Sequence, residues 1–242
     1  MKDVRIVPEG DLALLVEFEN EISKECNARV TALNQRIKEE KLKGIVETIP
    51  TFRSLLIYYD PLQTSYRKLS ARLKRLTRQT KEAVQGDKRI IQIPVCYGGA
   101  YGEDMQDVCA HTGLSQEEVV KLHTGTDYLI YMLGFLPGFP YLGGLNERLA
   151  TPRLKDPRKA IPAGAVGIGG EQTGIYPISS PGGWRLIGQT PIPLFDSRRK
   201  PPILYQAGDY IRFRAIDEEE YKQITDQLAT GEFDYQTLYP QV

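Results

Sequence analysis

Residues 134–142 read GFLPGFPYL, residues 161–177 read IPAGAVGIGGEQTGIYP, and residues 179–188 read SSPGGWRLIG. These three blocks belong to a stretch, residues 134–193, that holds twelve of the 22 glycines and nine of the 16 prolines. Glycine permits backbone angles that other residues avoid, and proline fixes turns. Between the turns the apolar segments are short, which is typical of a closed or nearly closed β-barrel. We therefore predict a mainly β domain that continues to about Arg214.

The sequence on either side of the blocks adds strands and helices to this domain. The expected strands span residues 89–97 and 127–135, and the expected helices span residues 103–111, a segment opened by Ser115, and residues 217–228. Glu118 is placed to complete a capping box with Ser115 at the start of the second helix. Residues 233–242 are expected to form a loosely held tail.

The first part of the chain has a different pattern, because residues 1–87 contain only three glycines and three prolines. Apolar residues alternate from Leu12 to Phe18, as in a largely buried strand, and Asn20 is placed to cap the helix that follows. The order strand, strand, helix, strand, strand, helix predicts a small α+β sandwich whose two helices cover one face of a sheet. We assign residues 1–83 to this α+β domain and residues 84–242 to the barrel domain, with polar residues 80–88 as the linker.

Composition excludes several classes of function. Lysine plus arginine and aspartate plus glutamate number 31 each in 242 residues, so no global field recruits nucleic acid or an anionic membrane. No apolar run approaches the roughly 20 residues that a spanning helix needs. The N-terminal residues lack the apolar core of a secretory signal, and three widely spaced cysteines do not form a disulfide framework. We expect a cytoplasmic protein.

Aromatic residues are interleaved with the glycines of the three blocks. They are Phe135, Phe139, Tyr141, Tyr176 and Trp184. Such residues line ligand pockets and peptide grooves, but they also fill the cores of barrels with tight corners. Glycine content alone leaves these alternatives open.

Several well-known motifs are missing from the chain. There is no G-x-x-x-x-G-K-[ST] loop, and residues 167–170 do not complete a dinucleotide fingerprint. No G-x-S-x-G elbow surrounds Ser180, so a serine hydrolase triad is not expected. The two histidines, His111 and His123, have no zinc spacing with the cysteines, so no metal site or prosthetic group is expected.

Taken together, the blocks and the residues around them resemble the allophanate hydrolase subunit 1 family, which is also known as the 5-oxoprolinase B-subunit family. The resemblance includes Arg153 with Lys155, the sequence LFD at residues 194–196, and GD at residues 208–209 ahead of IRF at 211–213. It implies a two-domain protein whose C-terminal barrel is cyclophilin-like. The arrangement of Phe, His and Arg associated with cyclophilin catalysis is absent, so prolyl isomerase activity is not expected.

The resemblance also implies partners and a reaction. The chain would act with the 5-oxoprolinase C-subunit, which is similar to allophanate hydrolase subunit 2, and with the A-subunit. Together they would open 5-oxo-L-proline to L-glutamate at the expense of ATP, and the chain would be inactive alone, with ATP bound at an interface between subunits. For one branch of the family it implies binding to a sporulation histidine kinase and inhibition of its autophosphorylation. The alternative is a purely protein-binding kinase inhibitor with no catalytic role, and in either case the open sheet face could support a homodimer.

Lactam opening requires groups that bind the substrate and activate its carbonyl oxygen. Glu171, the only acid in the three blocks, is the candidate base or metal-organising carboxylate, with Arg153 and His123 as further catalytic candidates. The expected substrate or nucleotide contacts are Arg158, Gly167, Gly169, Gly170, Gln172, Ser180 and Arg185, where the arginines hold carboxylate or phosphate and the glycine amides form an anion-binding nest. The expected partner groove comprises Phe139, Tyr141, Tyr176 and Trp184. The competing interpretations are ordinary surface charge for each arginine and a hydrogen-bonded helix-end residue for His123.

Overall fold

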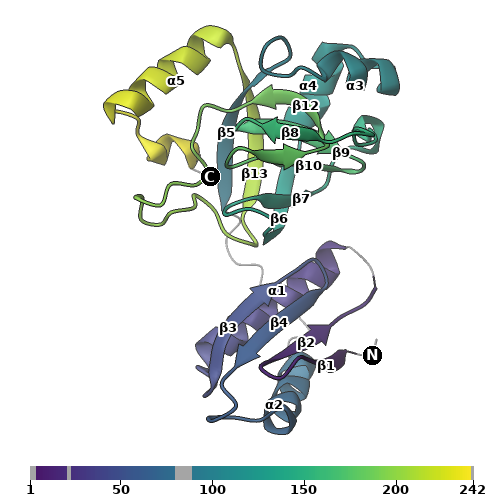
Figure 1. The fold of residues 1–242 in the computed structure, drawn as a ribbon, viewed down its shortest axis with the longest axis vertical. Helices are drawn as coiled ribbons and strands as arrows, with labels where there is room; N and C mark the ends of the chain where they lie inside the picture. Colours follow the sequence, from purple (N-terminus) through teal and green to yellow (C-terminus); the bar gives the residue numbers. More distant parts are fainter. Residues whose placement is uncertain (1–3, 21–22, 80–88, 241–242) are drawn as a thin grey trace. The chain divides into compact units, whose positions relative to one another are not determined.

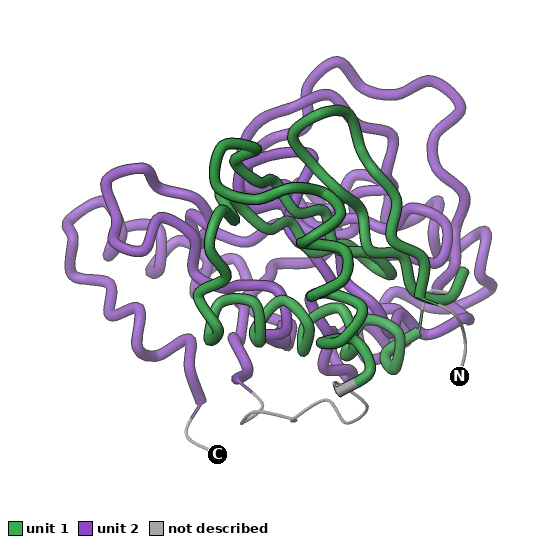
Figure 2. Tube along the Cα trace, turned by 90° about the horizontal axis from the view of Figure 1, so that it is seen from below, with its two compact units in different colours: residues 1–87 green, residues 88–242 purple. Residues whose placement is uncertain are grey.

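The computed structural model describes residues 4–20, 23–79 and 89–240, and its chain divides into two compact units, residues 1–87 and 88–242 (Figures 1 and 2). The predicted linker, residues 80–88, lies outside the described residues, as does the predicted boundary between residues 83 and 84. Each unit has its own hydrophobic core and is described by itself.

The first unit is an antiparallel four-stranded sheet in the order β1-β2-β4-β3, with two helices. Its elements are β1 (Arg5–Glu9), β2 (Ala13–Glu17), α1 (Lys24–Glu39), β3 (Ile45–Pro50), β4 (Ser54–Tyr59) and α2 (Tyr66–Gln79). Alternate residues Leu14 and Val16 of β2 and Leu55 and Ile57 of β4 are fully buried in one cluster with the apolar faces of both helices. Side chains at alternate positions share a face, so both helices cover the same side of the sheet, as predicted.

One detail of this unit differs from the prediction. Ser23, not Asn20, caps α1, and its hydroxyl accepts a hydrogen bond from the Cys26 amide at 3.2 Å. Asparagine and serine are equally good N-caps, so sequence preference does not choose between them.

The second unit is built on a barrel. Its elements are β5 (Ile90–Tyr97), α3 (Met105–Thr112), α4 (Gln116–Thr124), β6 (Asp127–Leu133), β7 (Pro140–Gly143), η1 (Glu147–Leu149), β8 (Arg158–Ile161), β9 (Ala165–Gly169), β10 (Gln172–Ile175), β11 (Ser180–Gly182), β12 (Arg185–Gln189), β13 (Tyr210–Ile216), α5 (Glu218–Thr230) and η2 (Tyr235–Leu238). Seven strands close in the order β10-β7-β6-β13-β5-β12-β9, and β8 and β11 form a separate pair. The last strand, β13, runs parallel to the first, β5, over seven paired residues from Tyr210 to Ile216. The predicted mainly β barrel is confirmed.

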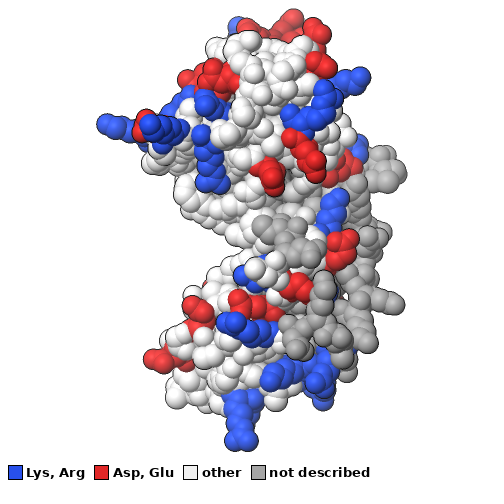
Figure 3. All heavy atoms as spheres, turned by 90° about the vertical axis from the view of Figure 1, so that its right-hand side faces the viewer, with Lys and Arg blue, Asp and Glu red and all other residues white. Residues whose placement is uncertain are grey.

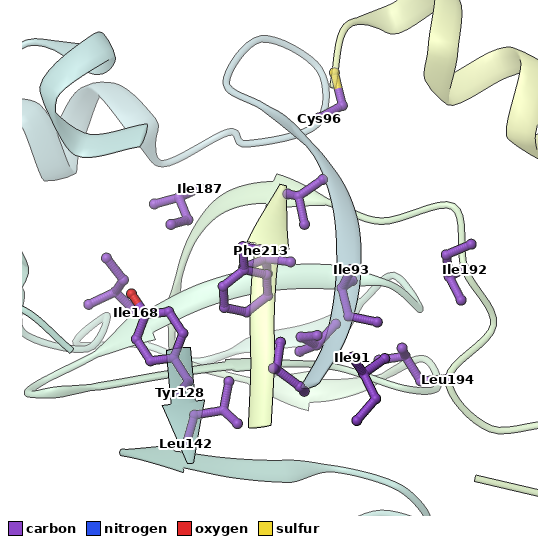
Figure 4. Close-up of a cluster of buried hydrophobic side chains, with 14 of the residues drawn as sticks. Ile91, Ile93, Cys96, Tyr128, Leu142, Ile168, Ile187, Ile192, Leu194 and Phe213 are labelled. Atoms are coloured by element: carbon purple, nitrogen blue, oxygen red, sulfur yellow. The ribbon is translucent and has the colours of Figure 1, made fainter. Parts of the chain in front are cut away.

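The barrel interior is filled by branched and aromatic side chains. Figure 4 shows residues from β5, β6 and β9 gathered around Phe213 of β13. Tyr128, Phe213, Ile91 and Ile93 are each at most 1% exposed. The barrel is therefore a packed core, and a ligand site has to lie at its rim or outside it.

Helices outside the barrel follow local signals in the sequence. The predicted capping box at α4 is present, with the Ser115 hydroxyl accepting from the Glu118 amide and the Glu118 carboxylate accepting from the Ser115 amide. The predicted loosely held tail is wrong for residues 233–240. Leu238 is buried, and the Tyr239 hydroxyl donates to the Leu204 carbonyl at 2.9 Å.

The surface carries interspersed charges of both signs on the face shown in Figure 3. Among the described residues, no helix combines the length and the hydropathy that crossing a membrane demands.

Candidate functional site

The three sequence blocks meet in a small pocket of the second unit. Its volume is about 150 Å³, and its lining comprises Phe135, Phe139, Tyr141, Arg153, Tyr176, Gly182, Gly183 and Trp184. Four of the lining residues are the predicted partner-groove residues, and Arg153 is a predicted catalytic candidate. The structure thus gathers one cation and five aromatic rings from segments up to about fifty residues apart.

Glycines of β9 and β10 form the surface on which Trp184 lies. A Cβ atom at Gly169 would be 2.5 Å from the indole nitrogen of Trp184, and one at Gly174 would be 3.0 Å from its six-membered ring. The first of these separations is closer than real Cβ atoms approach, so a larger residue at 169 would displace the indole. These glycines are needed because a large flat ring crosses the strands.

The aromatic side chains form an edge-to-face cluster centred on Phe139. Its ring centroid lies 5.2 Å from that of Tyr141, 5.5 Å from that of Tyr176 and 5.7 Å from that of Trp184, with the rings at steep angles. Such edge-to-face pairs are favourable beyond the area that they bury. Phe139, Tyr176 and Trp184 are buried, at 3%, 2% and 6% exposure, so they form the wall of a pocket and not an open groove for a peptide.

Arg153 supplies the positive charge of the pocket. Its guanidinium carbon lies 5.7 Å from the Trp184 ring centroid, a cation–π arrangement that holds the exposed side chain at the rim. The pKa of the Tyr176 hydroxyl is raised by burial, although a hydrogen bond with the Trp184 backbone and the nearby charges of Arg153 and Arg158 lower it in part. Tyr176 is therefore a neutral hydroxyl at physiological pH, beside a positive potential.

Arg158 and Arg185 form ion pairs with acids at the start of α3 and in the two residues before it. Arg158 contacts Glu103 at 2.9 Å and Asp104 at 2.8 Å, and Arg185 contacts Asp107 at 2.6 Å. The hydrogen bond that Arg158 donates to Asp104 is the main reason that the pKa of Arg158 is raised. Both arginines predicted as substrate or nucleotide contacts thus already have carboxylate partners. This geometry does not support those roles, which remain predictions.

Gly167, Gly169 and Gly170 do not form the predicted anion-binding nest. Gly167 and Gly169 lie in β9, an extended strand paired with β10 on one side and β12 on the other. The Gly170 amide donates to the Thr151 carbonyl at 2.8 Å. A nest requires successive amides that point at one anion, and here strand pairing directs them apart.

Three other predicted residues lie outside the pocket lining. Glu171 is exposed in the turn between β9 and β10, and Gln172 pairs with Gly169 at the start of β10. Ser180, in β11, is buried, and its hydroxyl has no hydrogen-bond partner within the described part of the chain. Nothing in this geometry supports their predicted roles, which remain predictions.

His123 is a core residue of the barrel, and nothing in its surroundings supports its predicted catalytic role. It is fully buried, its Nδ1 lies 2.7 Å from the Tyr97 hydroxyl, and its Nε2 lies 2.8 Å from the Thr173 hydroxyl. Burial lowers its pKa to about 3, so the ring is neutral and both nitrogens have partners. The competing interpretation, a hydrogen-bonded histidine at a helix end, describes what the structure shows.

Asp104 is a structural residue of the site that the sequence prediction missed. It is 4% exposed, and its second carboxylate oxygen accepts from the Leu186 amide at 2.7 Å. Asp104 thereby links the start of α3 to two strands. One link is to Leu186 of β12, which lies two residues after Trp184, and the other is to Arg158 of β8. An aspartate before a helix is common, and no local pattern marks this one as a link between strands.

Within the residues that the structure describes, no group of three or more histidines, cysteines, aspartates or glutamates is arranged to hold a metal ion.

Comparison with known proteins fits this architecture. Residues 4–205 match the family model described as carboxyltransferase domain, subdomain C and D, which places the chain among carboxyltransferase-type domains. Over 226 residues it is 44% identical to the B-subunit of 5-oxoprolinase from Bacillus subtilis (strain 168), covering 88% of this chain and 92% of that protein. It is also 44% identical over 204 residues to the 5-oxoprolinase B-subunit of Escherichia coli O157:H7, covering 84% and 92% of the two chains. The chain belongs to the 5-oxoprolinase B-subunit family.

Solved structures share the fold. A conserved uncharacterized protein from Pyrococcus horikoshii is 47% identical, with a TM-score of 0.54, and the match covers 90% of this chain and all of that one. TTHA0988 is 37% identical with a TM-score of 0.76, over 85% of this chain and 40% of its own. The urea carboxylase of Kluyveromyces lactis, at 22% identity and a TM-score of 0.75, shows the fold alone, over 96% of this chain and 23% of its own. In the last two proteins the shared region is one part of a longer chain.

Proposed function

We propose that this chain is part of an ATP-dependent 5-oxoprolinase complex, which opens 5-oxo-L-proline to L-glutamate, and that the aromatic pocket binds the cyclic substrate. The observation that carries the proposal is the pairing of Arg153 with a pocket of about 150 Å³ walled by Phe139, Tyr176 and Trp184. This volume is below the roughly 300–1,000 Å³ of sites for drug-sized ligands, and it suits one small ring compound.

The chemistry of the lining matches a flat ring that carries a carboxylate. The faces and edges of Phe139 and Trp184 offer apolar contact to the ring, and Arg153 offers a forked donor to the carboxylate. Gly182 and Gly183 let the backbone approach the ligand closely, and the neutral Tyr176 hydroxyl is a hydrogen-bonding group at the inner wall. These residues would bind and orient the lactam and keep bulk water from it.

The reaction itself needs groups from outside this pocket. Water adds across the lactam C–N bond, so that the carbonyl carbon gains a hydroxyl and the nitrogen gains a proton. ATP would activate the lactam oxygen by transferring its terminal phosphoryl group to it, with release of ADP. Attack of water on the activated carbon then opens the ring, and inorganic phosphate leaves. The chain has no familiar nucleotide motif, and in TTHA0988 the shared region is part of a longer chain. Both facts support an ATP site at an interface with the C- and A-subunits, and an isolated chain without activity.

The cysteines support the cellular setting of this proposal. Cys26, Cys96 and Cys109 are all free thiols, as is usual in a reducing compartment. A cytoplasmic complex is consistent with that state.

The test is glutamate formation from 5-oxoproline and ATP by the two partner proteins, with this chain present or omitted. Strict dependence on the chain is expected. Full activity of the partners without it would exclude a role in catalysis.

A second candidate, inhibition of a sporulation histidine kinase, is favoured by one observation. Phe135 is 66% exposed at the mouth of the pocket, and exposed aromatic residues often anchor protein partners. The purified chain should then inhibit kinase autophosphorylation without other subunits, and the C-subunit should relieve that inhibition if both bind this surface. Inhibition that an excess of the C-subunit leaves unchanged would rule out a shared surface.

A further inference from the structure

Phe135 has an unusual backbone conformation for a large side chain. Its φ is +66°, in the left-handed region that glycine and asparagine adopt far more easily. Glycines flank the position at 134 and 138, yet residue 135 itself is phenylalanine. Backbone conformations of this kind persist where the surrounding structure enforces them, and they cluster at ligand sites.

The loop around Phe135 is fixed at its base and carries the ring at its tip. The Gly134 amide donates to the Phe139 carbonyl at 3.2 Å, and the Phe139 amide donates to the Leu136 carbonyl at 3.0 Å. The Tyr205 hydroxyl anchors the far side through the Gly138 carbonyl at 2.8 Å. The loop therefore holds the Phe135 ring in place at the mouth of the pocket.

The ring borders the pocket but adds little to the core. Phe135 lines the pocket, and its centroid lies 5.7 Å from that of Phe139 in an edge-to-face pair. With 66% of its surface exposed, it buries far less apolar area than its buried neighbours. Stability of the fold does not account for a bulky aromatic residue in a left-handed conformation here.

We propose that Phe135 is the outer wall of the aromatic pocket, where it contacts the ring of a bound lactam acid and sets the ring size that the pocket accepts. The inference rests on the proposed function for the identity of the ligand. It requires that the isolated chain bind the ligand, because every named wall of the pocket comes from this chain.

Trp184 makes the test direct, because it is the one tryptophan of the chain and lies in the pocket. The full-length chain would be titrated with 5-oxoproline and with its six-membered lactam homologue, with tryptophan fluorescence and its quenching by acrylamide as readouts. The variants are Phe135→Ala, which removes the wall, and Phe135→Leu, which keeps an apolar group of smaller size. Leu62→Ala is the matched control, since Leu62 is 94% exposed and belongs to the first unit.

In the unmodified chain, 5-oxoproline should protect Trp184 from quenching and bind at least about tenfold more tightly than the six-membered ring, the discrimination expected of one methylene in a fitted pocket. Phe135→Ala should weaken 5-oxoproline binding about tenfold or more, reduce the preference between the two rings to near unity, and abolish the protection of Trp184. Phe135→Leu should give intermediate values, and Leu62→Ala should match the unmodified chain.

Two results would overturn the inference, and they are distinguishable. If the unmodified chain binds 5-oxoproline and Phe135→Ala binds it with the same affinity and ring preference, the wall assignment is wrong while the proposed function stands. If the unmodified chain binds neither ring, the inference fails because the chain alone does not hold the ligand. The glutamate assay of the assembled complex then decides separately whether the proposed function fails too.

Discussion

Arg153 differs from the other arginines near the pocket in what surrounds it. Arg158 and Arg185 are paired with Asp104 and Asp107, whereas Arg153 lies exposed over Trp184 at the pocket rim. We expect Arg153→Ala to raise the KM for 5-oxoproline by about 10- to 100-fold in the assembled enzyme, the equivalent of losing one charged hydrogen-bonding pair. The kcat should change much less, because the carboxylate is bound equally in the ground state and the transition state.

Two further variants separate charge from geometry. Arg153→Lys keeps the charge but loses the fork, so it should recover only part of the affinity. Lys159→Ala removes an exposed cation of β8 outside the pocket lining and should leave the KM unchanged. An equal rise in KM for Arg153→Ala and Lys159→Ala would show that only the overall positive field matters.

His123 makes the stability of the barrel depend on pH. Its pKa falls from 6.5 to about 3 on folding because the ring is buried. Between these values the unfolded chain binds a proton that the folded chain does not, so acid favours unfolding. The stability that the neutral, buried His123 contributes is therefore lost as the pH falls from 6.5 to about 3. The free energy of unfolding decreases by about 1.4 kcal/mol per pH unit in this range. Urea unfolding followed by Trp184 fluorescence at pH 6, 5 and 4 gives the free energy of unfolding at each pH. Its decrease per pH unit should be larger by that amount in the unmodified chain than in His123→Gln. An equal dependence of the free energy of unfolding on pH in the two proteins would show that carboxylates alone cause the acid sensitivity.

At the scale of elements, the start of α3 stabilises the strands that carry the pocket. Asp104 accepts from the Leu186 amide of β12 and from Arg158 of β8. Asp104→Ala leaves the buried Leu186 amide without its acceptor and removes one of the two carboxylate partners of Arg158, which keeps Glu103. We therefore expect a loss of about 1–3 kcal/mol in the free energy of unfolding. Asp107→Ala, which breaks an ion pair whose carboxylate side chain is 63% exposed, should cost less than about 1 kcal/mol. Denaturant titration of the two variants measures both changes in the free energy of unfolding. Similar losses of stability in the two variants would mean that Asp104 acts only through surface charge.

Elements defined by local patterns could be predicted from the sequence, and contacts between distant segments could not. The Ser115–Glu118 capping box and the alternation in β2 depend on neighbouring residues, and both were found as predicted. The glycines at 167 and 169 were correctly placed among short strands but wrongly assigned to an anion nest. Their packing partner, Trp184, lies about fifteen residues further along the chain. The surroundings of His123 could not be predicted for the same reason, because its partners Tyr97 and Thr173 come from strands far apart in the sequence.

At the scale of the whole molecule, each hydrophobic core takes its residues from one unit. The cluster around Leu14, Leu33 and Leu73 belongs to residues 1–87, and the clusters around Phe213 and around Trp184 belong to residues 88–242. A domain with its own core can fold alone. All the lining residues of the pocket likewise belong to the second unit.

A chain of residues 88–242 should therefore fold by itself and keep the pocket. Its Trp184 emission and its denaturant midpoint should match those of the corresponding transition in the full chain, and 5-oxoproline should perturb the fluorescence equally in both. Residues 1–87 are then free to serve assembly, so the fragment should not restore glutamate formation when it is mixed with the C- and A-subunits. A fragment that restores full activity would place the partner contacts on the barrel. One that remains unfolded would show that the barrel depends on the first unit for its stability.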